Sequence, residues 1–298
     1  MSQKILLFGG TGFLGSRFAA FFRKHGYTVE TPRVEVRDFS SVKQAFEEYK
    51  PDIVFNATGK TGTPNVDWCE THQGDTYSVN VVGSINVATA AKKRGVYAVQ
   101  LSSGCVYDGC GSNDGPEGCS DCGSNGGADG GKRGFTEEDK PNYFGSVYSR
   151  SRICCEMALK EFSVLQLRLR IPILGESCPK NLIDKLLRYP KMINKVNSCT
   201  VIEDFLPATL KLMEQKLTGV YNMTNPEPLD HRAIMDIYKE VVDPQHQCSF
   251  MSHDEEATLC QRRSNCVLSS AKREAAGAHM PKLSESLRRV LKHYDRPL

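Results

Sequence analysis

The sequence predicts an α/β protein, a Rossmann-type doubly wound parallel sheet with a smaller, mostly helical substrate-binding cap. In the first half, short apolar runs alternate with helical stretches of ten or more residues, which is typical of a parallel sheet covered on both faces. A glycine-rich turn directly follows the first apolar run. Beyond Pro172 the pattern changes to shorter helices and loops that prolines interrupt.

The expected elements of the first half follow one another in alternation. Residues 4–8 are an apolar run that glycine bounds, as expected of a strand buried on both faces. The pattern predicts strands at 4–8, 27–30, 52–56, 96–101 and 164–171, and helices at 16–25, 40–50, a segment ending near 94, and 143–162. We therefore place a dinucleotide-binding domain at 1–171 and a substrate-binding cap at 172–298, with 196–224 partly returning to the sheet.

Composition and charge exclude several classes of partner. The 38 basic and 35 acidic residues nearly balance, so neither nucleic acid nor a charged membrane surface is an expected partner. The uncharged stretch between Asp75 and Lys92 contains polar residues, whereas a membrane span needs about 20 mostly apolar ones. The first residues show no secretory signal, and twelve cysteines without one are typical of reduced thiols. We expect a cytoplasmic protein.

Three glycines mark a nucleotide-binding turn. Gly9, Gly12 and Gly15 are spaced G-x-x-G-x-x-G between a strand and a helix. Glycine lets the backbone approach a pyrophosphate, whose charge then lies against free N–H groups at the start of the helix. The alternative is a tight turn without a ligand. The predicted cofactor-binding residues are Gly9, Thr11, Gly12, Phe13, Leu14, Gly15, Arg33, Asn56, Ala57, Tyr148 and Arg152.

The choice of dinucleotide depends on the end of the second strand. An acid there would bind a ribose diol, and a nearby arginine would favour a 2′-phosphate. Glu30 and Arg33 are both present, and either side chain could simply be solvated. We predict NADPH, with NADH as the open alternative.

A tyrosine and a cation share one face of a predicted helix. Tyr148 and Arg152 are four residues apart, and Ser103 follows the fourth strand. A nearby cation lowers the pKa of a phenol from about 10, so that the phenol can exchange a proton near neutral pH. Alone, Tyr148 would be an ordinary helix tyrosine. With the glycine turn, the chain resembles the extended short-chain dehydrogenase/reductases, which use Ser/Thr, Tyr and Lys. Arg152 stands where the family has lysine, and its longer, planar side chain need not make equivalent contacts.

Further segments narrow the resemblance. Residues 59–70, 103–106, 135–142 and 263–265 resemble the bifunctional UDP-4-keto-6-deoxyglucose 3,5-epimerase/4-reductases, the nucleotide-rhamnose synthases related to dTDP-4-dehydrorhamnose reductase. The most specific segment is Pro-Asn-Val-Asp-Trp-Cys-Glu, which ends at Glu70. The resemblance implies NADPH-dependent conversion of UDP-4-keto-6-deoxyglucose to UDP-L-rhamnose, and a homodimer. The alternatives are a 4-reductase alone, a dTDP-sugar substrate, and a non-catalytic dinucleotide-binding subunit similar to the methionine adenosyltransferase β subunit.

The same resemblance implies roles for individual residues. Inverting carbons 3 and 5 beside a keto group requires proton removal on one face and return on the other. The family uses a cysteine and a cap lysine, which match Cys105 and Lys185; without the match, these would be a small buried side chain and a solvated helix residue. Tyr148 would protonate the new hydroxyl and Ser103 would hydrogen-bond it. Asn65, Asn80, Ser103 and Arg263 are the substrate-binding candidates, with a structural role open for Asn80 and plain surface polarity open for Asn65 and Arg263.

A glycine- and cysteine-rich insertion at about 108–134 lies outside the resemblance. It has too few apolar residues to offset its ordering entropy, so we expect mostly a mobile loop. Cys119 and Cys122 form one C-x-x-C, but structural zinc usually takes four ligands and a second pair is missing. We predict no metal site, with zinc or an occasional disulfide as the alternatives. A lid over the sugar pocket is a further hypothesis.

Overall fold

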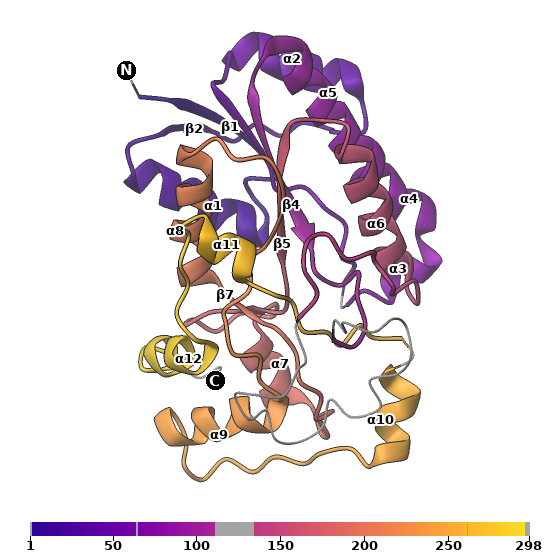
Figure 1. The fold of residues 1–298 in the computed structure, drawn as a ribbon, viewed down its shortest axis with the longest axis vertical. Coiled ribbons are helices and arrows are strands. Elements are labelled where there is room, and N and C mark those ends of the chain that lie inside the picture. The colour runs from indigo at the N-terminus through magenta and orange to yellow at the C-terminus, as the bar shows by residue number, and fades with distance from the viewer. Residues whose placement is uncertain (1, 64, 111–133, 261, 296–298) are drawn as a thin grey trace. The chain divides into compact units, whose positions relative to one another are not determined.

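A computed structural model describes residues 2–63, 65–110, 134–260 and 262–295 (Figure 1). Of the insertion expected at about 108–134, residues 111–133, and with them Cys119 and Cys122, lie outside the described residues. The elements, in chain order, are β1 (Lys4–Phe8), α1 (Phe13–Lys24), β2 (Thr28–Glu30), α2 (Phe39–Tyr49), β3 (Ile53–Asn56), α3 (Trp68–Thr71), α4 (Gln73–Tyr77), the π-helix η1 (Ser78–Gly83), α5 (Ser84–Arg94), β4 (Tyr97–Ser103), α6 (Val147–Leu159), β5 (Val164–Leu169), β6 (Pro172–Ile173), α7 (Leu182–Arg188), β7 (Thr200–Val201), α8 (Ile202–Glu214), β8 (Gly219–Asn222), α9 (His231–Val241), α10 (His253–Cys260), α11 (Ala271–Ala275) and α12 (Leu283–Leu291).

The main sheet confirms the predicted Rossmann-type fold. Its strand order is β2-β1-β3-β4-β5-β8, and β1 pairs in parallel with β2 on one side and β3 on the other. Ile5 therefore has Val29 and Ile53 as its two neighbours in register. From β1 the chain goes first to β2 on one side of it, and then crosses back to β3 on the other side. Such a reversal of direction, at the carboxyl ends of the strands, is where ligands bind in open α/β sheets.

Apolar helix faces cover both sides of this sheet. On one side, α2, α5 and α6 bury Phe46, Val87 and Leu159 in a cluster with Leu6 and Val54 of the sheet. Figure 1 shows α1 on the opposite side. There the rings of Phe18 and Phe22 contact Phe55, with centroid separations of 4.5 and 5.5 Å. A strand that is buried on both faces is apolar at nearly every position, and β1 has this pattern from Ile5 to Phe8.

Two predicted elements are shorter than expected. The helix predicted at 143–162 begins only at Val147, because the Ser146 side chain accepts a hydrogen bond from the Ser149 N–H and caps the helix. The strand predicted at 164–171 ends at Leu169. Ile171 has φ +40°, a left-handed conformation that an extended strand cannot contain.

The chain divides into two compact units that it enters more than once. The first contains residues 1–106, 143–168 and 212–221; the second contains 107–142, 169–211 and 222–298. Within the second, β6 pairs in parallel with β7, and a buried cluster joins Ile183, Ile234 and Leu287 of α7, α9 and α12. The last strand of the main sheet, β8, comes from the 196–224 segment. None of the helices among the described residues is both long and apolar enough to cross a bilayer.

Candidate active site

The glycine turn between β1 and α1 is shaped by close backbone contacts. Gly9 has φ +77°, and its carbonyl accepts a hydrogen bond from the Gly12 N–H at 2.9 Å. A Cβ on Gly15 would lie 2.1 Å from the Gly9 oxygen, so no larger residue fits there. Gly12 begins α1 without a side-chain cap. This uncapped start of the helix is the kind of position where an anion binds in nucleotide-binding turns.

A cavity of about 330 Å³ opens beside this turn, entirely within the first unit. Thr31, Arg33 and Glu35, from the segment after β2, form one wall. At the end of β2, the residue that lines the cavity is Thr31 and not Glu30, the acid considered for binding a ribose diol. Arg33 is exposed and makes no ion pair or hydrogen bond with the described residues. The complete lining is Gly9, Gly10, Thr11, Thr31, Pro32, Arg33, Val34, Glu35 and Thr58.

The predicted residues Asn56 and Ala57 shape the opposite side of the turn. The buried Asn56 side chain donates to Gln100 Oε1 at 2.8 Å and accepts from the Thr58 N–H and hydroxyl. A Cβ on Gly9 would lie 2.9 Å from the Ala57 carbonyl carbon. The Asn56 side chain therefore holds the loop after β3 through Thr58, and Ala57 lies against the glycine turn with its backbone.

Four predicted catalytic residues come from one region of the first unit. Ser103 ends β4, and its Oγ accepts a hydrogen bond from the Cys105 N–H at 3.1 Å. Cys105 packs against a buried cluster that contains Tyr148 and Val147 at the start of α6. The Arg152 guanidinium lies 5.3 Å from the Tyr148 ring centroid. A hydroxyl, a phenol, a thiol and a cation thus share one buried region, which the sequence alone could not establish.

Arg152 is a buried cation. It is 6% exposed, Nη1 donates to the Leu101 carbonyl at 3.5 Å, and Nε has no hydrogen-bond partner among the described atoms. Burial opposes its charge, but the nearby Tyr148 phenol and Cys155 thiol outweigh this and raise the pKa of Arg152. The charge is therefore permanent, and the buried Nε–H group lacks a hydrogen-bond partner among the described atoms.

Asn80 is fully buried in η1 and makes its hydrogen bonds within the protein. Its Oδ1 accepts from the Lys60 N–H at 2.8 Å, and its Nδ2 donates to the Lys60 carbonyl and to Ser151 Oγ. Ser151 lies between Tyr148 and Arg152 and donates to the Tyr148 carbonyl at 2.7 Å. These contacts support the structural one of the two roles considered for Asn80.

The Asn65–Glu70 segment supports the start of α6. Val66 and Trp68 pack against the cluster of Val147 and Tyr148, and Glu70 Oε1 accepts the Val147 N–H at 2.8 Å. Asn65 is exposed and accepts the Asp67 N–H at 2.8 Å, which holds the local turn. The sequence marked this segment as specific, but its packing role was missed because nothing in the local pattern connects it to α6.

Lys185 lies on α7 in the second unit. Partial burial lowers the pKa of its ammonium group, with the neighbouring charge of Lys180 adding to the effect. The neutral amine is then more accessible near neutral pH than in a solvated lysine, as a proton-transfer group requires.

Arg263 begins a segment that a buried arginine holds in place. Arg170, 1% exposed, donates to Ser264 Oγ at 3.0 Å and to the Ser264 carbonyl at 2.6 Å. The neighbouring Asn265 N–H bonds Asp108 Oδ1 at 2.9 Å. The Arg263 side chain is half-buried and donates to the Arg262 carbonyl. The described residues contain no group of three or more His, Cys, Asp or Glu side chains that could hold a metal ion.

Nearly the whole chain is similar to known proteins. Residues 3–296 match the family described as the RmlD substrate binding domain. The chain is 35% identical over 289 residues to a trifunctional UDP-glucose 4,6-dehydratase/UDP-4-keto-6-deoxy-D-glucose 3,5-epimerase/UDP-4-keto-L-rhamnose-reductase of Arabidopsis thaliana. The match covers 96% of this chain and 41% of that relative, so the chain spans less than half of the longer protein.

Two further matches have nearly the same length as this chain. A bifunctional dTDP-4-dehydrorhamnose 3,5-epimerase/dTDP-4-dehydrorhamnose reductase of Arabidopsis thaliana is 32% identical over 96% of this chain and 91% of its own. The crystal structure of the L780 UDP-rhamnose synthase from Acanthamoeba polyphaga mimivirus superposes with a TM-score of 0.88, at 28% identity. That superposition covers 98% of this chain and 100% of the other.

Proposed function

This chain belongs to the RmlD substrate-binding-domain family, and on that premise we propose that it is an NADPH-dependent enzyme that converts UDP-4-keto-6-deoxyglucose to UDP-L-rhamnose. The reaction has two parts, epimerisation at carbons 3 and 5 and reduction at carbon 4. The observation that carries the proposal is the grouping of Ser103, Cys105, Tyr148 and Arg152 in the unit that holds the glycine turn. The trifunctional and bifunctional relatives support the substrate class.

The residues present fit a dinucleotide. The turn at Gly9 and Gly15 is closed to any Cβ, and α1 starts without a side-chain cap, so a pyrophosphate would lie close to the backbone at the start of the helix. Arg33 lies on the cavity wall without a partner in the described part of the chain, and it would face a 2′-phosphate. The Nε–H of Arg152 would meet the nicotinamide ribose, where the wider family uses lysine. When bound, NADPH supplies the hydride that reduces carbon 4.

The reduction step requires a proton donor and a polar anchor. Tyr148 would donate its proton to the new alkoxide, and the fixed charge of Arg152, whose guanidinium lies 5.3 Å from the Tyr148 ring centroid, would stabilise the resulting phenolate. The Ser103 hydroxyl, oriented by the Cys105 N–H, would donate to the same sugar oxygen. Arg152 cannot release a proton itself, so solvent must resupply Tyr148.

The epimerisation requires two groups that exchange protons with the sugar. Cys105 packs against the Tyr148 cluster, and the pKa of Lys185 is lowered. A thiol and an amine of this kind would serve on opposite faces of the sugar. The bifunctional relative of similar length supports the assignment of both activities to one chain of this size.

One experiment tests both parts. The chain is incubated with NADPH and UDP-4-keto-6-deoxyglucose in deuterated water, and the product is identified by NMR. We expect UDP-L-rhamnose with deuterium at carbons 3 and 5. Tyr148→Phe should keep the exchange and lose most of the reduction, and Cys105→Ala should lose the exchange. Full exchange in Cys105→Ala would refute its role, and reduction of only a pre-epimerised sugar would identify a 4-reductase.

One observation favours a second candidate function. Arg152 replaces the family lysine, as would be tolerated in a non-catalytic dinucleotide-binding subunit. Such a subunit would bind NADPH without turnover, and Arg152→Lys would not create any. Turnover that appears only in Arg152→Lys would instead show that the site is intact except for the arginine.

A further inference from the structure

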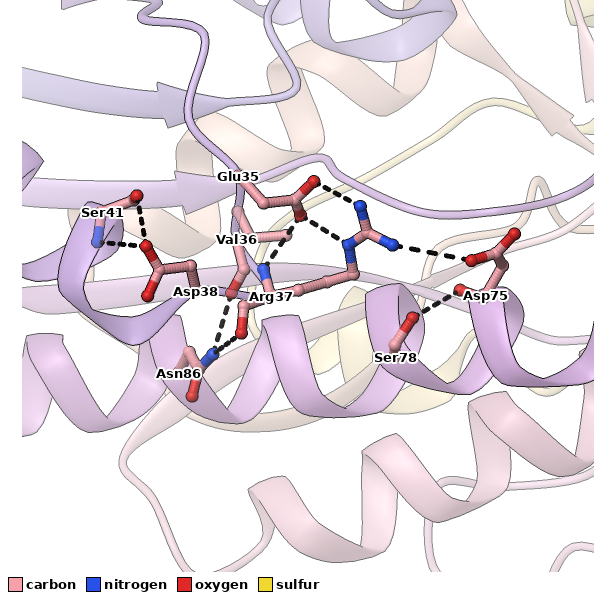
Figure 2. A network of polar contacts seen from close by, with 8 residues as sticks. All are labelled: Glu35, Val36, Arg37, Asp38, Ser41, Asp75, Ser78 and Asn86. Atoms are coloured by element: carbon pink, nitrogen blue, oxygen red, sulfur yellow. Dashed lines mark hydrogen bonds and ion pairs between the residues drawn. The ribbon is translucent and has the colours of Figure 1, made fainter.

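The cavity wall beside the glycine turn carries two side chains of opposite charge, Arg33 and Glu35. Their states differ. Arg33 makes no contact that would neutralise it within the described residues, whereas Glu35 is bound by Arg37 through both carboxylate oxygens (Figure 2). Arg37 Nε donates to Oε1 at 2.8 Å and Nη2 to Oε2 at 2.6 Å. The Arg37 N–H adds a third bond to Oε1 at 3.1 Å.

Arg37 is held from the far side by α4 and α5. Its Nη1 lies 3.6 Å from Asp75 Oδ1 on α4. The Asn86 amide of α5 donates to the carbonyls of Val36 and Arg37 at 2.9 and 3.0 Å, as Figure 2 shows. The segment therefore presents Glu35 to the cavity in one arrangement, with its carboxylate already occupied. The paired guanidinium accordingly holds the pKa of Glu35 below its usual range.

A carboxylate on this wall decides between the two dinucleotides. An unpaired one repels a 2′-phosphate and accepts hydrogen bonds from a ribose diol, so it favours NADH. One that is bound at both oxygens by a guanidinium offers few acceptor positions and little net charge. The free charge left on the wall is then that of Arg33.

We propose that Arg37 is a specificity-determining residue, which favours a 2′-phosphorylated dinucleotide by neutralising Glu35 and leaves Arg33 to bind the phosphate. The inference rests on the proposed dinucleotide site. Arg37 is a cation close to the cavity, but in this proposal it acts on Glu35 and does not contact the phosphate.

The test measures binding of two cofactor fragments, 2′,5′-ADP and 5′-AMP, by calorimetry at fixed low salt. Arg37→Ala should weaken 2′,5′-ADP roughly two- to fivefold, the range of exposed ion pairs, and leave 5′-AMP unchanged or tighter. Arg33→Ala should weaken 2′,5′-ADP by roughly tenfold or more. Adding Glu35→Gln to Arg37→Ala should restore the original ratio of the two affinities, because the repelling charge is gone.

Two control variants distinguish an effect of the Glu35 charge on cofactor binding from a general disturbance of the fold. Asp75→Asn removes the outer contact of Arg37 and keeps its pair with Glu35, so the ratio should not change. Arg94→Ala breaks a comparable ion pair with Glu47, outside the cavity, and should change neither affinity. Equal weakening of both fragments by Arg37→Ala would overturn the proposal, as would failure of Glu35→Gln to restore the ratio. If the unmodified protein binds neither fragment, the dinucleotide site itself is refuted.

Discussion

The guanidinium of Arg152 occupies space that a glycine in another loop leaves open. A Cβ on Gly59 would lie 2.4 Å from Arg152 Nη2, closer than any relaxed contact. The atom in conflict is on the side chain, but Arg152 is buried and its Nη1 bonds the Leu101 carbonyl. The longer cation in place of lysine therefore depends on Gly59 in this chain.

We expect Gly59→Ala to displace Arg152 and lower kcat about ten- to a hundredfold, since a shift of about 1 Å at a reacting group has effects of that size. Combining it with Arg152→Lys should recover much of the loss, because lysine ends before the new methyl group. Gly74→Ala is the matched control, because a Cβ there meets nothing within 4 Å. Additive losses in the double variant, measured as kcat with NADPH and the keto-sugar, would contradict this dependence.

Among the elements, η1 joins the loop after β3 to the helix that carries Tyr148. A π-turn within a helix is unusual and often lies at a functional site. Its Asn80 bonds both backbone groups of Lys60 and the Ser151 hydroxyl from a fully buried position. Asn80 is thus the hub that links three segments in the first unit.

Asn80→Ala should destabilise the protein by about 1–3 kcal/mol, because it leaves polar groups without their buried partner. Urea unfolding followed by circular dichroism measures this change. Gln73→Ala, an exposed position on α4, should have little effect. An Asn80→Ala variant of unchanged stability that loses substrate binding would point instead to direct substrate contact.

A buried ion pair links α6 to β5, and we expect the stability of the protein to depend on it. Arg168 bonds Glu156 through Nε and Nη2 at 2.7 and 2.6 Å, with both side chains at most 2% exposed. Glu156→Gln should cost about 3–5 kcal/mol in unfolding experiments, because it removes the charge that balances a buried guanidinium. Glu47→Gln, in an exposed pair, should change stability little. Similar values for the two variants would refute the expectation.

For the whole molecule, the sequence predicts those features that depend on neighbouring residues. The strands of the sheet, the glycine turn and the i, i+4 pair of Tyr148 and Arg152 are all local patterns, and the predicted fold class is confirmed. The features it missed join distant segments: Gly59 lies behind Arg152, Glu70 holds the start of α6, and Arg37 pairs with Asp75 as well as with the nearby Glu35. Even the Glu35–Arg37 pair gains its meaning only from the cavity that Thr58 and Gly9 help to form.

We expect a buried histidine to make the stability of the protein sensitive to acid. His231, 7% exposed at the start of α9, bonds the Ile193 carbonyl through Nδ1, and burial lowers its pKa below the ordinary value of 6.5. Above pH 6.5 the imidazole is neutral in both the folded and unfolded states and has no effect. As the pH falls below 6.5, the unfolded chain takes up the proton first, so stability decreases until the folded pKa is passed. The slope from this one group is at most about 1.4 kcal/mol per pH unit.

We therefore expect the Tm to fall between pH 6.5 and 5, above the range where most carboxylates titrate. His231→Asn retains a neutral donor for the Ile193 carbonyl and should flatten this part of the Tm profile. His253→Asn is the control, because it makes the same substitution at a histidine whose side chain is 91% exposed. An unchanged slope in His231→Asn would show that other groups cause the acid sensitivity, and an equal flattening in His253→Asn would remove burial as its cause.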